Sequence, residues 1–128
     1  MLSVTPVYAA LLSLVYIGLA MRVSKYRRTQ LLSLGDHGDT RLQHLIRAHG
    51  NASETIPLGL LLLLMAELQG APGLAVHVLG LMLLAGRLAH ARGLSAEPPV
   101  LRLRIIGMGL TVVMMAITAV GLLLHAIF

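Results

Sequence analysis

Residues 47–65 read RAHGNASETIPLGLLLLLM, an octet of mostly small and polar residues followed by a strongly apolar stretch. The octet, residues 47–54, holds an arginine, an asparagine and an acid, and the stretch after it is rich in leucine. Such a stretch is typical of a helix that crosses lipid, which needs roughly 20 mostly apolar residues. Charged groups at the edge of lipid are costly and by default mark a function. The segment therefore predicts a membrane helix with a candidate site at its mouth.

The whole chain has the composition of an integral membrane protein. Of its 128 residues, 57% are hydrophobic and only 12% are charged, whereas soluble domains have about 25% charged residues. Cysteine is absent, so the chain itself offers no disulfide and no thiolate ligand or nucleophile. The net charge of +5 comes from basic residues beside apolar runs. That arrangement indicates topology signals and contacts with anionic headgroups, and no nucleic-acid partner is expected.

Four segments are long and apolar enough to span a membrane, at about residues 5–21, 41–68, 72–91 and 104–127. We therefore expect a single domain over residues 1–128, folded as an all-α integral membrane four-helix bundle. The second segment is longer than a ~30 Å hydrocarbon core requires, so its first turns should project beyond it. Asp39 or Thr40 would cap this helix, and Pro57 would kink it.

All ten basic residues fall on one side of the predicted bundle. They lie between the first and second segments, between the third and fourth, or at the adjoining helix ends: Arg22, Lys25, Arg27, Arg28, Arg41, Arg47, Arg87, Arg92, Arg102 and Arg104. The short turn at residues 67–73 and both termini have none. The positive-inside rule then predicts that both basic loops are cytoplasmic and that both termini lie outside.

Helical spacing groups the polar residues of the octet on one face. Arg47, Asn51 and Glu54 are four and three residues apart, so their side chains share one stripe. Leu58 and Leu61 continue this stripe into the membrane. A stripe that is polar at one end and apolar at the other is expected to face a neighbouring helix rather than lipid.

The third and fourth helices place further polar groups at the same membrane level. Arg87 and His90 lie near the end of the third helix, and Arg102 and Arg104 open the fourth. Together with the stripe they suit a small ligand with several anionic groups and one amine. Arginine binds carboxylates in bidentate fashion, and Glu54 would take the ammonium.

A structural interpretation explains the same residues. Arginines at helix ends commonly extend to lipid headgroups, and Arg47 with Glu54 could form a purely structural interhelical ion pair. No metal site is expected, because His44 and His49 are five residues apart, which does not place them as a helical ligand pair.

Three motifs of this chain resemble those of the MAPEG family, the membrane-associated proteins in eicosanoid and glutathione metabolism. Residues 47–57, RAHGNASETIP, resemble its second-helix motif, and residues 86–90, GRLAH, resemble its third-helix motif. Residues 104–111, RIIGMGLT, are similar to the start of the fourth helix in bacterial members. The length, the four spans and the long second helix also match, so the resemblance covers nearly the whole chain.

The resemblance implies a homotrimer in a bacterial inner membrane, with a glutathione site between subunits near the cytoplasmic side. Glutathione would be the co-substrate, and no metal is implied. By position, the glutathione-binding residues would be Arg22, Arg47, Asn51, Glu54, Arg87 and His90. Arg104 would be the catalytic residue that stabilises the thiolate, since a nearby cation lowers the pKa of a thiol and the thiolate is the nucleophile.

Two functions follow. The first is a membrane-bound glutathione transferase or glutathione-dependent peroxidase acting on lipophilic electrophiles or lipid hydroperoxides, with glutathione, a lipophilic small molecule, membrane lipid and other copies of the chain as partners. The second is a non-catalytic binding or scaffold protein of the same fold. It is favoured because His90, Leu94 and Met108 stand where eukaryotic members have tyrosines, and Ile105 where they often have serine. A channel would need polar residues at the bilayer centre, where these helices are apolar.

Overall fold

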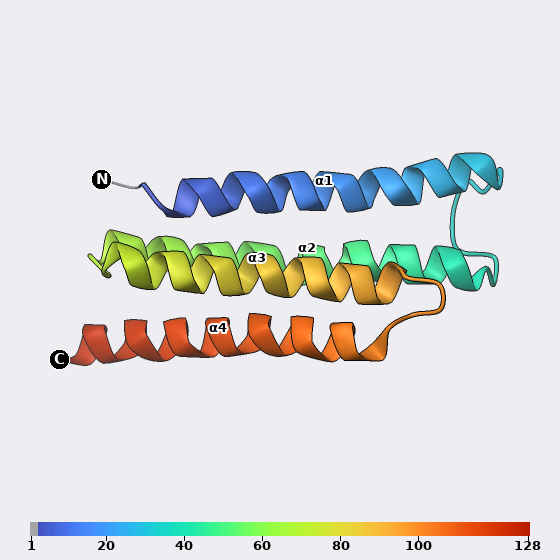
Figure 1. Ribbon diagram of the computed structural model, residues 1–128. Coiled ribbons are helices and arrows are strands. Elements are labelled where there is room, and N and C mark those ends of the chain that lie inside the picture. The colour runs from blue at the N-terminus through green and yellow to red at the C-terminus, as the bar shows by residue number, and fades with distance from the viewer. Residues whose placement is uncertain (1–2) are drawn as a thin grey trace.

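Four long helices lie side by side in the computed structural model, which describes residues 3–128 (Figure 1). α1 spans Thr5–Thr29, α2 spans Thr40–Leu68, α3 spans Gly73–Ser95 and α4 spans Leu101–Ile127. Each is long and apolar enough to cross a membrane. The two chain ends and the α2–α3 turn lie at one end of the bundle, and the α1–α2 and α3–α4 connections lie at the other (Figure 1). The prediction of an all-α chain with four spans is confirmed.

The helices extend past the apolar spans that the sequence predicts. α1 continues to Thr29 instead of ending near Met21, α3 continues to Ser95, and α4 already begins at Leu101. Apolar length locates only the part of a helix that suits lipid, whereas arginine and lysine are good helix formers in water. Lys25, Arg27 and Arg28, expected in a loop, therefore sit on the last turns of α1.

At the end that holds both termini, α2 caps the start of α1. The Glu67 carboxylate accepts hydrogen bonds from the backbone amides of Ser3, Val4 and Thr5, at 2.6, 2.9 and 2.6 Å. These amides begin a helix and have no acceptor within it, and a negative charge there also favours the helix dipole. A side chain of one helix thus fixes the beginning of another.

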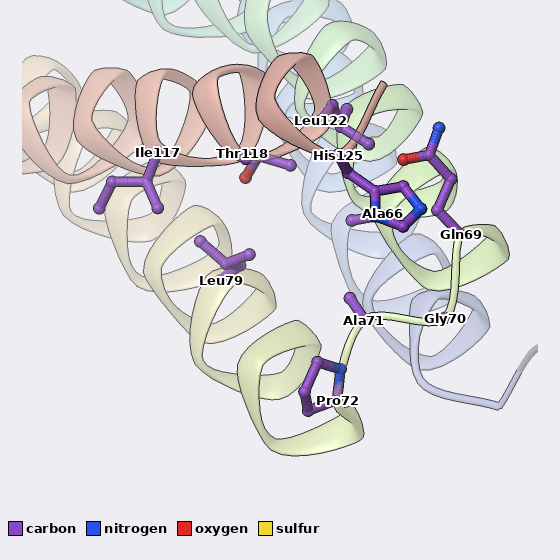
Figure 2. Close-up of a pocket in the computed structure, with 11 residues that line it drawn as sticks. Ala66, Gln69, Gly70, Ala71, Pro72, Leu79, Ile117, Thr118, Leu122 and His125 are labelled. Atoms are coloured by element: carbon purple, nitrogen blue, oxygen red, sulfur yellow. The ribbon is translucent and has the colours of Figure 1, made fainter. Parts of the chain in front are cut away.

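A cavity of about 360 Å³ opens at this same end, between the α2–α3 turn and the last turns of α4 (Figure 2). Its walls are mostly apolar and include Leu79, Ile117 and Leu122, while Gln69 and His125 supply polar groups. None of the arginines singled out in the sequence lines this cavity. It is therefore separate from the candidate site at the basic end.

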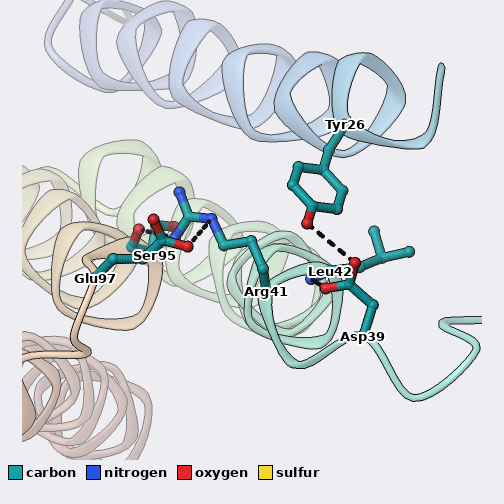
Figure 3. A network of polar contacts seen from close by, with 6 residues as sticks. All are labelled: Tyr26, Asp39, Arg41, Leu42, Ser95 and Glu97. Carbon is teal, nitrogen blue, oxygen red and sulfur yellow. Dashed lines mark hydrogen bonds and ion pairs between the residues drawn. The ribbon is translucent and has the colours of Figure 1, made fainter. Parts of the chain in front are cut away.

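At the opposite end, polar contacts join α2 to α1 and to the α3–α4 connection (Figure 3). Asp39 caps α2 as the sequence predicts, because its carboxylate accepts a hydrogen bond from the Leu42 amide at 2.9 Å. The Tyr26 hydroxyl of α1 donates to the same carboxylate at 3.0 Å. Arg41 forms an ion pair with Glu97 of the α3–α4 connection at 2.8 Å. The projecting start of α2 is thereby held in place.

Glycines allow α3 and α4 to touch backbone to backbone. A Cβ added at Gly107 of α4 would lie 2.5 Å from the Gly86 carbonyl oxygen and 2.8 Å from the His90 Cβ. A Cβ at Gly93 of α3 would lie 2.8 Å from the Arg104 amide nitrogen. Close approach through small residues is a common way for membrane helices to pack. It brings the polar residues of α3 directly against α4.

Replacing Gly107 with alanine should therefore destabilise the bundle, by about 1–3 kcal/mol, because the added methyl group has no room between the two backbones. The matched control is Gly109→Ala on the same helix, where a Cβ would meet nothing within 4 Å. That control should leave stability within about 1 kcal/mol of the wild type. Thermal unfolding in detergent measures both, and equal melting temperatures for the two variants would contradict the close packing.

The Asp39 cap predicts a dependence of stability on pH. Its hydrogen bond from the Leu42 amide, with a smaller contribution from Tyr26, holds the pKa of the Asp39 carboxyl below its ordinary value of 3.8. A carboxyl with a lowered folded-state pKa stabilises the fold above that ordinary value, and the contribution disappears as the pH falls through the folded-state pKa. Melting temperature should therefore fall with acidification below about pH 4.

The variants Asp39→Ala and Asp39→Asn separate the cap from the charge. Alanine should lower the melting temperature at neutral pH, because the Leu42 amide loses its acceptor. Asparagine keeps a capping oxygen without titrating, so it should reduce the drop seen on acidification. If Asp39→Asn loses stability on acidification as steeply as the wild type, another group is responsible.

Candidate functional site

Arg87 of α3 is at the centre of the candidate site. Its side chain is almost fully buried, with 2% of its surface exposed. Its Nε donates to Thr111 Oγ1 at 2.9 Å, and its Nη1 donates to Thr55 Oγ1 at 2.9 Å and to Asn51 Oδ1. Its Nη2 donates to the Gly107 carbonyl at 3.3 Å. One guanidinium thus joins α2, α3 and α4.

The acceptors around Arg87 are all neutral groups. Among residues 3–128, the two ion pairs in the structure involve Arg41 and Arg47, and Arg87 has no carboxylate partner. A buried charge with satisfied hydrogen bonds but no counter-charge makes its surroundings electropositive. The centre of the site therefore favours an anion beside it.

The stripe predicted on α2 is present. Arg47 and Glu54 form an ion pair at 3.8 Å along one face of α2, and about three-fifths of each side chain is exposed. Because both residues belong to α2, the ion pair joins two turns of one helix and not two helices. An exposed pair of this kind adds little stability. Its two charges remain accessible to a ligand.

His90 marks the place where arginines of three helices meet. His90 is 9% exposed and lies one turn after Arg87 on α3. It packs against Gly107 of α4, one turn after Arg104, and Arg87 in turn joins Asn51, one turn after Arg47 on α2. The Nε atom of Arg104 is buried and has no hydrogen-bond acceptor among residues 3–128. A buried donor without an acceptor is costly, so the Arg104 Nε–H group is available to donate a hydrogen bond to a ligand here.

Arg22 lies apart from this group. It lines a pocket between α1 and α2 together with Lys25, Arg41 and Leu45. Leu45 is roughly 200° around α2 from Arg47, at about 100° per residue. Within one chain, the structure therefore brings five of the predicted glutathione-binding residues and Arg104 together, and Arg22 faces another side of α2.

Among residues 3–128, no helix covers the apolar continuation of the stripe. Leu58 is 51% exposed and Leu61 is 52% exposed. The expectation that the stripe faces a neighbouring helix is met at Asn51, whose Oδ1 accepts from Arg87 of α3, and is not met at Leu58 and Leu61. The outward face of the bundle is therefore formed by Arg47, Glu54, Leu58 and Leu61.

A groove of about 500 Å³ runs between α1 and α2 beside this outward face. It is lined by Ser13, Tyr16, Ile17, Ser53, Ile56, Pro57 and Leu60. Ser53 is the residue before Glu54, so the groove lies next to the polar stripe. Its lining is largely apolar, which suits a lipophilic molecule.

Thr55 and Thr111 hold Arg87 in place, and the sequence interpretation gave them no role. Both are buried, at 9% and 0% exposed. A signal was available: Thr55 follows Asn51 by four residues and so lies one turn further along α2. Thr111 lies within the fourth-helix motif, but only the packing of α3 against α4 brings it to Arg87.

Replacing Arg87 should cost roughly 2–4 kcal/mol of stability, because Asn51, Thr55 and Gly107 lose a buried donor. Arg87→Lys should lose most of the same stability, since one ammonium cannot reach all of the acceptors on α2 and α4. The control is Arg92→Ala, an exposed arginine on the same helix, which should change stability by less than about 0.5 kcal/mol. Denaturant unfolding in detergent measures these differences. A lysine variant as stable as the wild type would contradict the role of the guanidinium.

Comparison with known proteins shows the family of the chain. The model of the MAPEG family matches residues 5–124, which include every residue of the candidate site. The inner membrane protein YecN of Escherichia coli strain K12 is 41% identical over 90 residues, covering 70% of this chain and 69% of that protein. YecN of the Escherichia coli strain CFT073 matches to the same extent. No solved structure matches the chain. With its four spans and this match, the chain belongs to the MAPEG family and is a membrane protein of that family.

Proposed function

We propose that the protein is a membrane-bound glutathione transferase or glutathione-dependent peroxidase that acts on lipophilic electrophiles or lipid hydroperoxides. The observation that carries the proposal is the joining of the α2 stripe to the α3–α4 contact: Arg87 donates to Asn51, and Arg47 pairs with Glu54 on the same stripe. Arg104 lies one turn before Gly107, which packs against His90. Glutathione has two carboxylates, one ammonium and a thiol. A site with several cations and one acid complements these charges.

The residues of the α2 stripe would hold the ends of the tripeptide. Arg47 and Glu54 are exposed and carry opposite charges, so they suit a carboxylate and the ammonium. Asn51 Oδ1 already accepts from Arg87, which leaves the Asn51 amide nitrogen to donate to the ligand. Arg87 would thus position Asn51 and supply positive electrostatic potential from the interior of the bundle.

Arg104 is the residue proposed to act on the sulfur. Its buried Nε has no acceptor among residues 3–128, and a thiolate is an acceptor that also carries the matching charge. The chemistry that glutathione supplies is attack by this thiolate on an electrophilic carbon, whose leaving group departs with the bonding electrons. The apolar groove between α1 and α2 is the proposed position of the lipophilic partner.

A homotrimer would complete the site. The uncovered face of Leu58 and Leu61 offers a contact for a second copy, and Arg22 faces away from the stripe within its own chain. Arg22 of one copy would then reach the stripe of the next. The basic loops would be cytoplasmic and the termini outside. The inner membrane is proposed because the relative YecN is named an inner membrane protein.

Turnover of purified protein with glutathione and an aryl halide tests the reaction. Arg104→Ala should reduce turnover by about 100-fold, the effect of removing one donor that stabilises developing charge. Arg102→Ala is the matched control, because this arginine opens the same helix but is exposed, and it should retain turnover. An Arg104→Ala enzyme as active as the wild type would rule out the proposed role.

A non-catalytic binding protein is the second candidate. Leu94 is buried at 6% exposure, and Met108 places its sulfur 3.7 Å from Arg87 Nη2. At these two positions, where eukaryotic members of the family resemble one another in having tyrosines, the site offers no hydroxyl to a thiolate. Such a site would bind glutathione without activating it.

Thermal unfolding with millimolar glutathione separates the two candidates. A ligand that binds only the folded protein raises its melting temperature. A rise in melting temperature with thiol-dependent turnover supports the enzyme, and a rise without turnover supports the binding protein. Arg47→Ala should abolish the rise in either case, and no rise with the wild type would contradict both.

A further inference from the structure

The pocket that contains Arg22 is a separate cationic feature of the molecule. It has a volume of about 290 Å³ and lies between the last turns of α1 and the first turns of α2. Its lining residues are Arg22, Lys25, Tyr26, Thr29, Arg41 and Leu45. All of its charged members are basic. The α1–α2 connection beside it lies at the same end of the bundle as the α3–α4 connection (Figure 1).

The acids nearest to this pocket are already engaged. Glu97 pairs with Arg41 at 2.8 Å, and Asp39 accepts from the Leu42 amide and the Tyr26 hydroxyl (Figure 3). Neither ion pair found among residues 3–128 involves Arg22 or Lys25. The pocket therefore keeps the positive charge of both side chains. A bound anion would neutralise it.

The surface of α1 leads from this pocket into the apolar part of the helix. Leu14, Gly18, Met21 and Lys25 are four, three and four residues apart, so they lie along one face. Leu14 is 67% exposed and Met21 is 57% exposed. Gly18 leaves open space where a side chain would stand. An apolar strip with a shallow notch thus ends at the Lys25 ammonium.

We propose that this pocket binds an anionic phospholipid from the leaflet on the side of the basic connections. Its phosphate would lie between Arg22 and Lys25, and an acyl chain would lie along Leu14, Gly18 and Met21. Guanidinium and ammonium groups are the usual partners of phosphate, and juxtamembrane basic residues are attracted to anionic lipids. The apolar strip favours a lipid over a soluble anion, because only a lipid fills both parts.

This lipid site does not depend on glutathione. The pocket residues Arg41 and Leu45 lie on a different side of α2 from the Arg47 stripe. The lipid and glutathione would therefore not compete for one site within one chain. In the proposed trimer Arg22 also reaches the glutathione site of a neighbouring copy, so both ligands would use this side chain, whereas Lys25 belongs to the lipid site alone. The test therefore uses Lys25.

Native mass spectrometry of the detergent-purified full chain, mixed with equal amounts of phosphatidylglycerol and phosphatidylcholine, measures the preference. The wild type should retain phosphatidylglycerol severalfold more than phosphatidylcholine. Lys25→Gln should lower phosphatidylglycerol occupancy about fivefold, the equivalent of about 1 kcal/mol for one basic residue near an anionic membrane. Arg102→Gln removes an exposed cation at the same end and should leave occupancy unchanged.

Thermal unfolding with inorganic phosphate supplies the second arm. Phosphatidylglycerol should raise the melting temperature of the wild type more than that of Lys25→Gln, whereas inorganic phosphate at the same concentration should raise neither. Equal retention of the two lipids, or equal loss of phosphatidylglycerol from Lys25→Gln and Arg102→Gln, would overturn the proposal. A rise with inorganic phosphate as large as that with the lipid would also overturn it, in favour of a soluble anion.

Discussion

The guanidinium of Arg87 is the constraint on which the rest of the structure depends. It is buried and charged, and it is satisfied only because Asn51 and Thr55 of α2 and Thr111 and Gly107 of α4 reach it from two sides. The contact between α3 and α4 must be close enough for this, and Gly86 and Gly107 make it so. The same hydrogen bonds orient Asn51 within the α2 stripe. Packing and site geometry are therefore set by one side chain.

Much of the architecture could be predicted from residue order alone. The apolar runs located four spans, and Asp39 was recognised as a cap, because both depend on local sequence. Periodicity placed Arg47 and Glu54 on one face for the same reason. The ends of α1 and α3 were less accessible, since hydropathy marks where a helix is apolar and not where the helix stops.

The side-chain contacts inside the candidate site could not be predicted from local sequence. The roles of Thr55 and Thr111 depend on how α2, α3 and α4 pack, which no single helix encodes. The separation of Arg22 from the stripe is also a property of the packed bundle. Five of the expected glutathione-binding residues lie together within one chain, with Arg47 and Glu54 exposed and Arg87 and His90 buried. Arg22 lies apart from them, in the pocket between α1 and α2.

The burial of Arg87 also bears on how the protein is made. An arginine at the centre of a lone membrane helix costs about 2.5–3.5 kcal/mol on insertion. Arg87 lies nearer the basic end of α3, so its cost is a part of that amount, and it has no carboxylate partner among residues 3–128. That cost is removed only when the acceptors of α2 and α4 have arrived. We therefore expect α3 to be fully stable in the membrane only once both α2 and α4 have packed against it.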